Sequence, residues 1–175
     1  MKYLVVSDIH GGMTSAKLIK ELFTEEKIDK ILLLGDVLYH GPRNDLPLDY
    51  NPKVVMNVLN EIEDSIISIK GNCDAEVDEM VLKFKLNNQL DLKINDLNAH
   101  LEHGHHLDMF EGKADIILSG HTHIPVLKKE NGIIYLNPGS ITLPKGGNPK
   151  TYAIWDEHKI TIYTFDKEVF NQYEY

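Results

Sequence analysis

The first half of the chain alternates between short apolar runs and stretches with apolar residues at helical spacing. The runs at residues 3–7, 30–34 and 65–70 are short and contain β-branched residues, which predicts buried strands. Segments 13–27 and 52–62 carry apolar residues three and four positions apart, which predicts helices. The alternating order of strands and helices predicts a mostly parallel sheet with right-handed crossovers.

The second half of the chain is richer in predicted strands. Asn131-Gly132 stands between two extended runs and is a strong signal for a hairpin. The tail, residues 167–175, carries Val169 and Phe170 among polar residues, and it is interpreted as either a docked end or a contact surface. The expected strands are 84–86, 89–94, 99–102, 115–118, 126–130, 133–136, 152–155 and 159–165.

Length and composition fit a single α/β domain spanning residues 1–175, long enough to bury a core without disulfides. The net charge of −9 argues against a broad basic surface, so a nucleic-acid partner is not expected. No apolar run approaches the roughly 18 residues that span a bilayer, so no membrane partner is expected. The only cysteine is Cys73 and the N-terminus lacks a secretion-signal pattern, which together favour a cytoplasmic location.

Five polar clusters directly follow predicted strands. In α/β sheets, ligand sites form beyond the carboxyl ends of the strands, and glycine there permits sharp turns and close approach. We therefore expect the clusters to converge on one crevice. They are Ser7-Asp8-Ile9-His10-Gly11, Gly35-Asp36-Val37, Gly71-Asn72-Cys73-Asp74, Glu102-His103-Gly104-His105 and Ser119-Gly120-His121-Thr122-His123.

The side chains in these clusters predict a metal centre. Carboxylate, imidazole and amide oxygen together suit Mn²⁺, Fe²⁺, Zn²⁺ or Ni²⁺ better than Ca²⁺ or Cu⁺. Seven ligands are too many for one tetrahedral zinc and suit two ions, about 3.5–4 Å apart and bridged by a carboxylate. The candidates are Asp8, His10, Asp36, Asn72, His103, His121 and His123.

Each cluster alone also has an ordinary structural explanation. An isolated Asp-x-His is usually a turn or a helix cap, and a Gly-Asp after a strand is commonly a turn. Asn72 could occupy a left-handed turn position, and His121 and His123 could be surface histidines. Five such clusters in one chain, each at a strand end, favour the metal interpretation over chance.

The five clusters resemble the calcineurin-like metallophosphoesterase family, whose pattern runs D-x-H, GD, GN-x-[D/E], a histidine before glycine, and GHxH. The resemblance covers nearly the whole chain. It implies an α/β sandwich of two mixed sheets flanked by helices. Similarity to the small bacterial YfcE-type phosphodiesterases of this family rests on 40–44, 71–74, 137–140 and 144–149.

The resemblance also implies a ligand assignment and an activity. Asp8, His10 and His123 would hold one ion, Asn72, His103 and His121 the other, and Asp36 would bridge them. Two divalent ions are expected, Mn²⁺ foremost, with Zn²⁺, Ni²⁺ or Fe²⁺ as alternatives. The implied reaction is hydrolysis of a small phosphodiester by a hydroxide between the ions.

Four residues are candidate substrate contacts. Arg43 can bond phosphate through two hydrogen bonds, with Asn44 beside it, although an ordinary exposed loop is the alternative. His103 directly follows a predicted strand and is preferred as the metal ligand, which leaves His105 as a substrate contact. Many family members carry histidine where this chain has Cys73. A thiol with an ordinary pKa of about 8.5 is a poorer general acid, which favours diesters over monoesters.

The predicted catalytic residues are Asp36, Asn72, Cys73 and Arg43, and Asp74 is expected to orient a neighbouring group. The segment 137–140 is interpreted mainly as a structural turn.

Three other functions were weighed. A non-catalytic scaffold of the same fold would lack ligand positions, and none is missing here. Other metallohydrolase classes would show H-x-H-x-D-H or H-E-x-x-H, and neither motif occurs. The acidic charge argues against a nuclease. A homo-oligomer stays open because the tail and the hairpins carry apolar residues.

Overall fold

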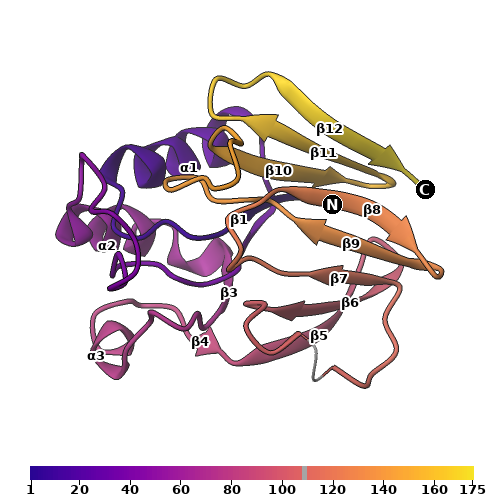
Figure 1. The fold of residues 1–175 in the computed structure, drawn as a ribbon, viewed down its shortest axis with the longest axis horizontal. Coiled ribbons are helices and arrows are strands. Elements are labelled where there is room, and N and C mark those ends of the chain that lie inside the picture. The colour runs from indigo at the N-terminus through magenta and orange to yellow at the C-terminus, as the bar shows by residue number, and fades with distance from the viewer. Residues whose placement is uncertain (108–109) are drawn as a thin grey trace.

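The computed structural model describes residues 1–107 and 110–175, and Figure 1 shows their arrangement. The elements are β1 (Lys2–Val6), α1 (Met13–Glu25), β2 (Lys30–Leu33), α2 (Pro52–Asn60), the 3₁₀ turn η1 (Glu63–Ser65), β3 (Ile66–Ile69), α3 (Glu76–Glu79), β4 (Leu86–Asn87), β5 (Gln89–Ile94), β6 (Leu97–Glu102), β7 (Ile116–Leu118), β8 (Val126–Glu130), β9 (Ile133–Asn137), β10 (Thr151–Asp156), β11 (Lys159–Thr164) and β12 (Val169–Glu174).

The strands form two mixed sheets. A seven-stranded sheet has the order β12-β11-β10-β1-β2-β3-β4, and a five-stranded sheet has the order β5-β6-β7-β9-β8. Strands β1 to β4 run parallel, as the alternating pattern predicts. The predicted hairpin at Asn131-Gly132 joins β8 and β9, which pair antiparallel.

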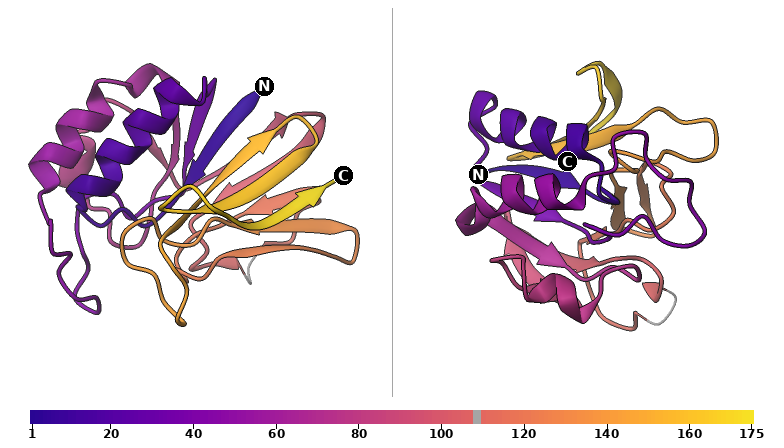
Figure 2. Two further views of the ribbon diagram at one scale, coloured as in Figure 1. Left: turned by 90° about the horizontal axis from the view of Figure 1, so that it is seen from above. Right: turned by 90° about the vertical axis from the view of Figure 1, so that its left-hand side faces the viewer.

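Successive side chains of β1 point to opposite faces of the larger sheet and so contribute to two hydrophobic cores. Leu4 and Val6 pack on the face covered by the helices, in a cluster that includes Leu22 of α1. Val5 points to the other face and packs in a second cluster with Leu101 of β6. Figure 2 shows the helices on one side of the larger sheet and the second sheet on the other.

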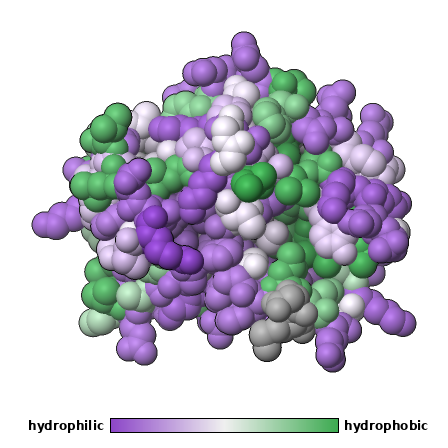
Figure 3. Space-filling view, viewed as in Figure 1, coloured by the Kyte–Doolittle hydropathy of each residue, from purple (hydrophilic) through white to green (hydrophobic). Residues whose placement is uncertain are grey.

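The tail is a docked strand. β12 pairs antiparallel with β11, so the docked-end interpretation is confirmed. Val169 and Phe170 are nevertheless 59% and 41% exposed, so a contact surface and a homo-oligomer stay predictions. Polar residues cover much of the face in Figure 3, with smaller apolar patches between them. Within the described residues, no helix is long and apolar enough to cross a bilayer.

Candidate metal centre

The loops after β1, β2, β3, β6 and β7 meet at one edge of the sandwich, as the sequence predicts. Backbone hydrogen bonds tie them together. The His10 amide donates to the Asp36 carbonyl at 2.9 Å, and the Gly120 amide donates to the His103 carbonyl at 2.8 Å. The two sheets are joined where the His121 amide donates to Asp8 Oδ2 at 3.0 Å.

Five of the seven predicted ligands adopt left-handed backbone conformations. Non-glycine residues seldom adopt positive φ, and such strain concentrates at functional sites. The surrounding hydrogen bonds hold these residues in place and turn their side chains toward a common centre. They are Asp8 (φ 56°), His10 (46°), Asp36 (56°), His121 (66°) and His123 (60°).

Two glycines permit the close approach of the loops. A Cβ on Gly71 would lie 2.1 Å from Asp36 Oδ1 and 2.4 Å from the Asp36 backbone nitrogen. A Cβ on Gly120 would lie 1.9 Å from the Ser7 hydroxyl oxygen and 2.9 Å from Asp8 Oδ2. Neither contact is sterically allowed, so these positions require glycine for the carboxylates to sit where they do.

One group of ligand atoms comes from Asp8, His10 and His123, which are all buried. Asp8 Oδ1 lies 3.6 Å from His10 Nε2 and 3.3 Å from His123 Nε2. The same oxygen has no hydrogen-bond partner among the described residues, although it is fully buried. A buried acceptor without a donor is costly unless a cation occupies the space beside it.

A second group lies on the other side of Asp36. Asp36 Oδ2 is 3.3 Å from His103 Nε2 and 3.5 Å from His10 Nε2, so one oxygen faces both groups. Asn72 Oδ1 lies 3.1 Å from His103 Nε2. Asp8, Asp36 and His103 also bring ligand atoms within reach of a single ion.

The imidazole rings are oriented for metal binding. The Nδ1 atoms of His10 and His103 donate to the carbonyls of Tyr39 and Leu34, at 2.8 and 2.6 Å, and His123 Nδ1 donates to the Leu143 carbonyl. When the rings are neutral, this leaves their Nε2 lone pairs directed toward the centre, the arrangement that metal-binding histidines commonly show.

The acceptor atoms in this centre face one another. His10 Nε2 and His123 Nε2 are 3.2 Å apart, although each ring already donates its Nδ1 proton to a backbone carbonyl. Opposed lone pairs, together with the partnerless Asp8 oxygen, fit cations and not a protein-only hydrogen-bond network. The residues present therefore fit divalent metal ions.

The charges of the centre shift the pKa values of its groups. Burial raises the pKa of the Asp8 carboxyl, but the His10 and His123 imidazoles that lie against it outweigh burial and hold this pKa well below its ordinary range. Burial also raises the pKa of Asp36, and His103 overcomes the effect and lowers it. Burial lowers the pKa of His103, whereas the Asp36 hydrogen bond and the nearby carboxylates raise it to about 9.

His121 and His105 lie at the side of the centre. The His121 ring centroid is 5.1 Å from that of His103, and His121 lines the adjacent cavity. Burial, followed by the charge of His103, lowers the pKa of His121. His105 is exposed, and its ring lies 5.5 Å from that of His103. The substrate role of His105 stays a prediction.

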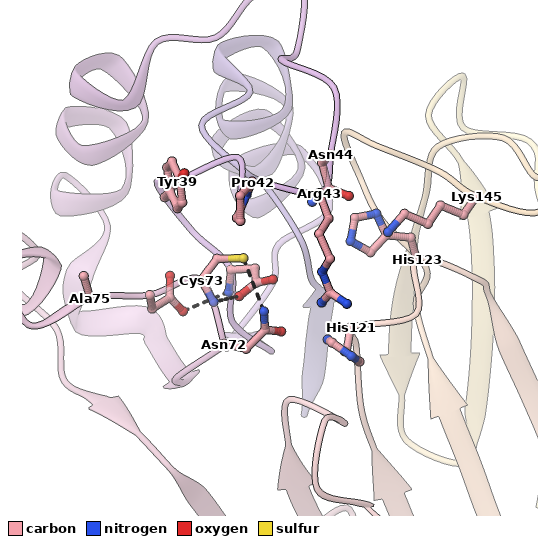
Figure 4. A pocket seen from close by; sticks show the side chains of 13 residues that line it. Tyr39, Pro42, Arg43, Asn44, Asn72, Cys73, Ala75, His121, His123 and Lys145 are labelled. Atoms are coloured by element: carbon pink, nitrogen blue, oxygen red, sulfur yellow. Dashed lines mark hydrogen bonds between the residues drawn. The ribbon is translucent and has the colours of Figure 1, made fainter.

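A cavity of about 410 Å³ opens above the centre (Figure 4). Arg43, Asn44 and Cys73 line it, and the Arg43 guanidinium points into it toward His121. Lys145 also lines the cavity; sequence reasoning used its segment, 144–149, for the family resemblance but assigned the lysine no role.

Cys73 is held against the centre. Its backbone amide donates to Asp36 Oδ1 at 2.8 Å, and its sulfur accepts from Asn72 Nδ2 at 3.4 Å. The thiol lies within ligand reach of His10 and Asp36. Burial, followed by the charge of Asp36, raises the pKa of Cys73 to about 12 in the metal-free protein.

Residues behind the ligands fix their loops. Asp74 accepts from the backbone amides of Asp36 (2.8 Å), Val37 (2.8 Å) and Gly71 (2.7 Å), which matches its expected orienting role. The Ser140 hydroxyl donates to the Asp8 carbonyl at 2.8 Å. The turn containing Ser140 is thus structural, and it supports the metal loop.

The sequence is similar to known phosphoesterases. Residues 1–159 match the model of the calcineurin-like phosphoesterase superfamily domain. The chain is 38% identical to the phosphodiesterase YfcE of Escherichia coli K12 over 167 residues, which are 93% of this chain and 91% of YfcE. A phosphodiesterase of Methanocaldococcus jannaschii is 27% identical, over 91% of this chain and 95% of that protein.

Solved structures share the fold. The structure of YfcE, a phosphoesterase from E. coli, matches with a TM-score of 0.95 at 36% identity and covers 99% of each chain. This match confirms the expected sandwich of two mixed sheets. Vacuolar protein sorting 29 from Cryptosporidium parvum matches with a TM-score of 0.68 at 18% identity, over 99% of this chain and 98% of that chain, which shows a common fold alone.

Proposed function

The chain belongs to the calcineurin-like phosphoesterase superfamily, and from this premise we propose that it is a metal-dependent phosphodiesterase acting on a small phosphodiester. The observation that carries the proposal is the position of Asp36. One carboxylate oxygen lies 3.5 Å from His10 Nε2 and 3.3 Å from His103 Nε2, which supports a bridge between two ions.

The ligands divide on either side of that bridge. Asp8, His10 and His123 would hold one ion, because their ligand atoms cluster and the Asp8 oxygen lacks a partner. Asn72, His103 and His121 would hold the other. Mixed carboxylate, imidazole and amide ligands favour Mn²⁺, with Zn²⁺, Ni²⁺ and Fe²⁺ as alternatives.

Two bound divalent ions would supply a bridging hydroxide as the nucleophile and offset charge on the phosphoryl oxygens. The protein's own part is to position the substrate. Arg43, with Asn44 beside it, reaches into the cavity, where its guanidinium would form paired hydrogen bonds to phosphate oxygens.

The identity of residue 73 supports diesters as substrates. A thiol is only a weak hydrogen-bond donor, so Cys73 would assist a departing oxygen less than a histidine at the same position. Esters whose leaving group departs without strong acid assistance are therefore preferred, and this favours diesters with good leaving groups over alkyl monoesters.

The experiment compares the protein with Asp36→Asn, using Asp166→Asn, an exposed change, as the control. Hydrolysis of bis(p-nitrophenyl) phosphate in Mn²⁺ should fall by at least about a hundredfold in Asp36→Asn. Metal analysis should show fewer ions per chain. Unchanged turnover with both ions retained would refute the bridging role, and no turnover of any diester by the native protein would refute the activity.

We further propose that residues 1–175 form one domain, because β1 contributes to both hydrophobic cores. A cytoplasmic location stays a prediction from the unpaired Cys73.

A further inference from the structure

A second cavity, of about 540 Å³, lies against the face of the five-stranded sheet that points away from the larger sheet. Its lining includes His100 and Glu102 of β6 and Phe110 of the following loop. Leu101, between the two polar residues, points the other way and packs between the sheets. The volume is within the range of small-molecule sites.

Two polar side chains in this cavity are buried without the partners that burial normally requires. His100 is 1% exposed and Glu102 is 7% exposed. Among the described residues, neither His100 Nε2 nor Glu102 Oε1 has a hydrogen-bond partner. An unsatisfied buried polar atom costs free energy comparable to a lost hydrogen bond, so each one calls for an explanation.

The unpaired atoms are both acceptors when the His100 ring is neutral. Asp91 Oδ1 lies 2.7 Å from His100 Nδ1, and a carboxylate can only accept, so the ring proton is on Nδ1. The lone pair of Nε2 then faces Glu102 Oε2 at 3.6 Å, too far for a hydrogen bond. The site therefore has unpaired hydrogen-bond acceptors and lacks hydrogen-bond donors to pair with them.

The cavity is also acidic. Asp91, Glu102 and Glu111 all line it, and no lysine or arginine of the described chain does so. Among the described residues, the only basic side chain within ion-pairing distance of Asp91 and Glu102 is His100. A ligand with a positive charge and N–H groups would balance the negative charge of the cavity and would donate hydrogen bonds to the unpaired acceptors.

An aromatic ring closes one side of the site. Phe110 stacks on His100 with ring centroids 3.9 Å apart and an interplanar angle of 24°. A Cβ on Gly112 would lie 2.5 Å from the Phe110 ring, so glycine at 112 lets the ring settle over His100. Aromatic rings beside carboxylates are a common setting for binding organic cations.

We propose that this cavity binds a small organic cation carrying N–H donors, such as an ammonium or a guanidinium. Glu102 Oε1 and His100 Nε2 accept from the cation, and Asp91 and Glu111 add negative charge. A metal ion fits less well, because groups of three ligand atoms close enough for one ion occur only at the active centre within the described residues. The site is independent of the proposed phosphodiesterase activity.

The test is a titration of the full-length ¹⁵N-labelled protein with agmatine, which carries both an ammonium and a guanidinium group. Tetramethylammonium, a cation without N–H donors, is the matched probe. Saturable shifts of the backbone amides of Gln89, Glu102 and Glu111 are expected with agmatine only. Glu102→Gln should weaken binding by about tenfold or more, whereas Glu130→Gln, on an exposed strand, should not.

Three results would overturn the proposal. The absence of saturable shifts at millimolar agmatine would exclude the site, and equal shifts with tetramethylammonium would show unspecific charge attraction. Nitrogen NMR could also find the His100 ring protonated on both nitrogens in the free protein. The ring would then supply the positive charge and the donor beside Glu102, and no cationic ligand would be needed. Asp91→Asn, at a side chain that is 76% exposed, provides a second variant that should also weaken binding if Glu102→Gln folds poorly.

Discussion

The Nε2 atoms of His10 and His123 lie 3.2 Å apart, although each ring already donates its Nδ1 proton to a backbone carbonyl. Two lone pairs at this distance repel unless a cation or a shared proton separates them. The metal-free protein therefore carries an electrostatic penalty at its centre, which bound ions would remove.

Removing the ions should lower the thermal stability, and restoring Mn²⁺ should recover it. A ligand at a hundred times its Kd stabilises the native state by about 2.7 kcal/mol, which is about 5–10 °C in Tm for a chain of this size. Differential scanning calorimetry of chelated and reconstituted protein measures the shift. His123→Ala should reduce the Mn²⁺-dependent rise, and His158→Ala, in an exposed turn, should leave it intact. An equal rise in both variants would contradict the assignment.

Metal binding should release protons and strengthen with pH. Asp36 and the other carboxylates raise the pKa of His103 to about 9, against about 6.5 in the unfolded chain. Protonated His103 thus stabilises the metal-free fold below about pH 6.5, and this contribution is lost as the pH rises through about 9. An ion needs the neutral ring, so its apparent affinity should rise with pH up to about 9.

Calorimetric titration at pH 7.5 in buffers of different ionisation enthalpy gives the number of protons released. His103→Asn should release about one proton fewer than the native protein. Affinity that is flat or falls with pH would show that His103 is not protonated in the metal-free centre.

Gly71→Ala should damage the centre and lower the stability, because the new Cβ also meets the Asp36 backbone nitrogen. The new Cβ would overlap Asp36 Oδ1 and displace the proposed bridging carboxylate. Diesterase activity and metal content should both fall. Gly132→Ala is the matched control, because Gly132 has φ 87° but nothing within 4 Å of its added Cβ. That variant should lose about 1 kcal/mol of stability and keep its activity. Equal activity in the two alanine variants would argue against the steric explanation.

Local sequence signals predicted the parallel strands of the first half and the convergence of the five polar clusters, whereas the family resemblance implied the sandwich of two mixed sheets. Short apolar runs placed the β1, β2 and β3 strands, and each ligand cluster followed such a run. The sequence did not identify the tail as a strand. β12 pairs with β11 through its backbone, but neighbouring Val169 and Phe170 are both exposed, so the tail lacks the alternation of apolar and polar residues that marks a half-buried strand.

The individual contacts between distant loops were beyond local sequence patterns, although the family resemblance implied that His10 and His123 hold the same ion. The Ser140 bond to the Asp8 carbonyl joins residues 132 positions apart, and the opposed nitrogens of His10 and His123 join residues 113 apart. The sheet order determines these contacts, and no local pattern encodes it. The unpaired acceptors of His100 and Glu102 were missed for the same reason, because alternation along β6 predicts their face but not what covers it.

Cys73→His should shift the enzyme toward phosphomonoesters. The side chain of residue 73 lines the cavity, and its backbone amide is anchored to Asp36. An imidazole there has an ordinary pKa of about 6.5 and can protonate a departing alkoxide near neutral pH, whereas a thiol, with an ordinary pKa of about 8.5, is a poorer general acid. General acid assistance contributes about a hundredfold or more where the leaving group is poor, so alkyl monoesters should gain most.

The measurement is kcat/KM for matched aryl and alkyl monoesters and diesters in Mn²⁺, with Cys73→Ser as the control that lacks both thiol and imidazole. A monoester-to-diester ratio that is the same in all three proteins would show that residue 73 does not assist the leaving group.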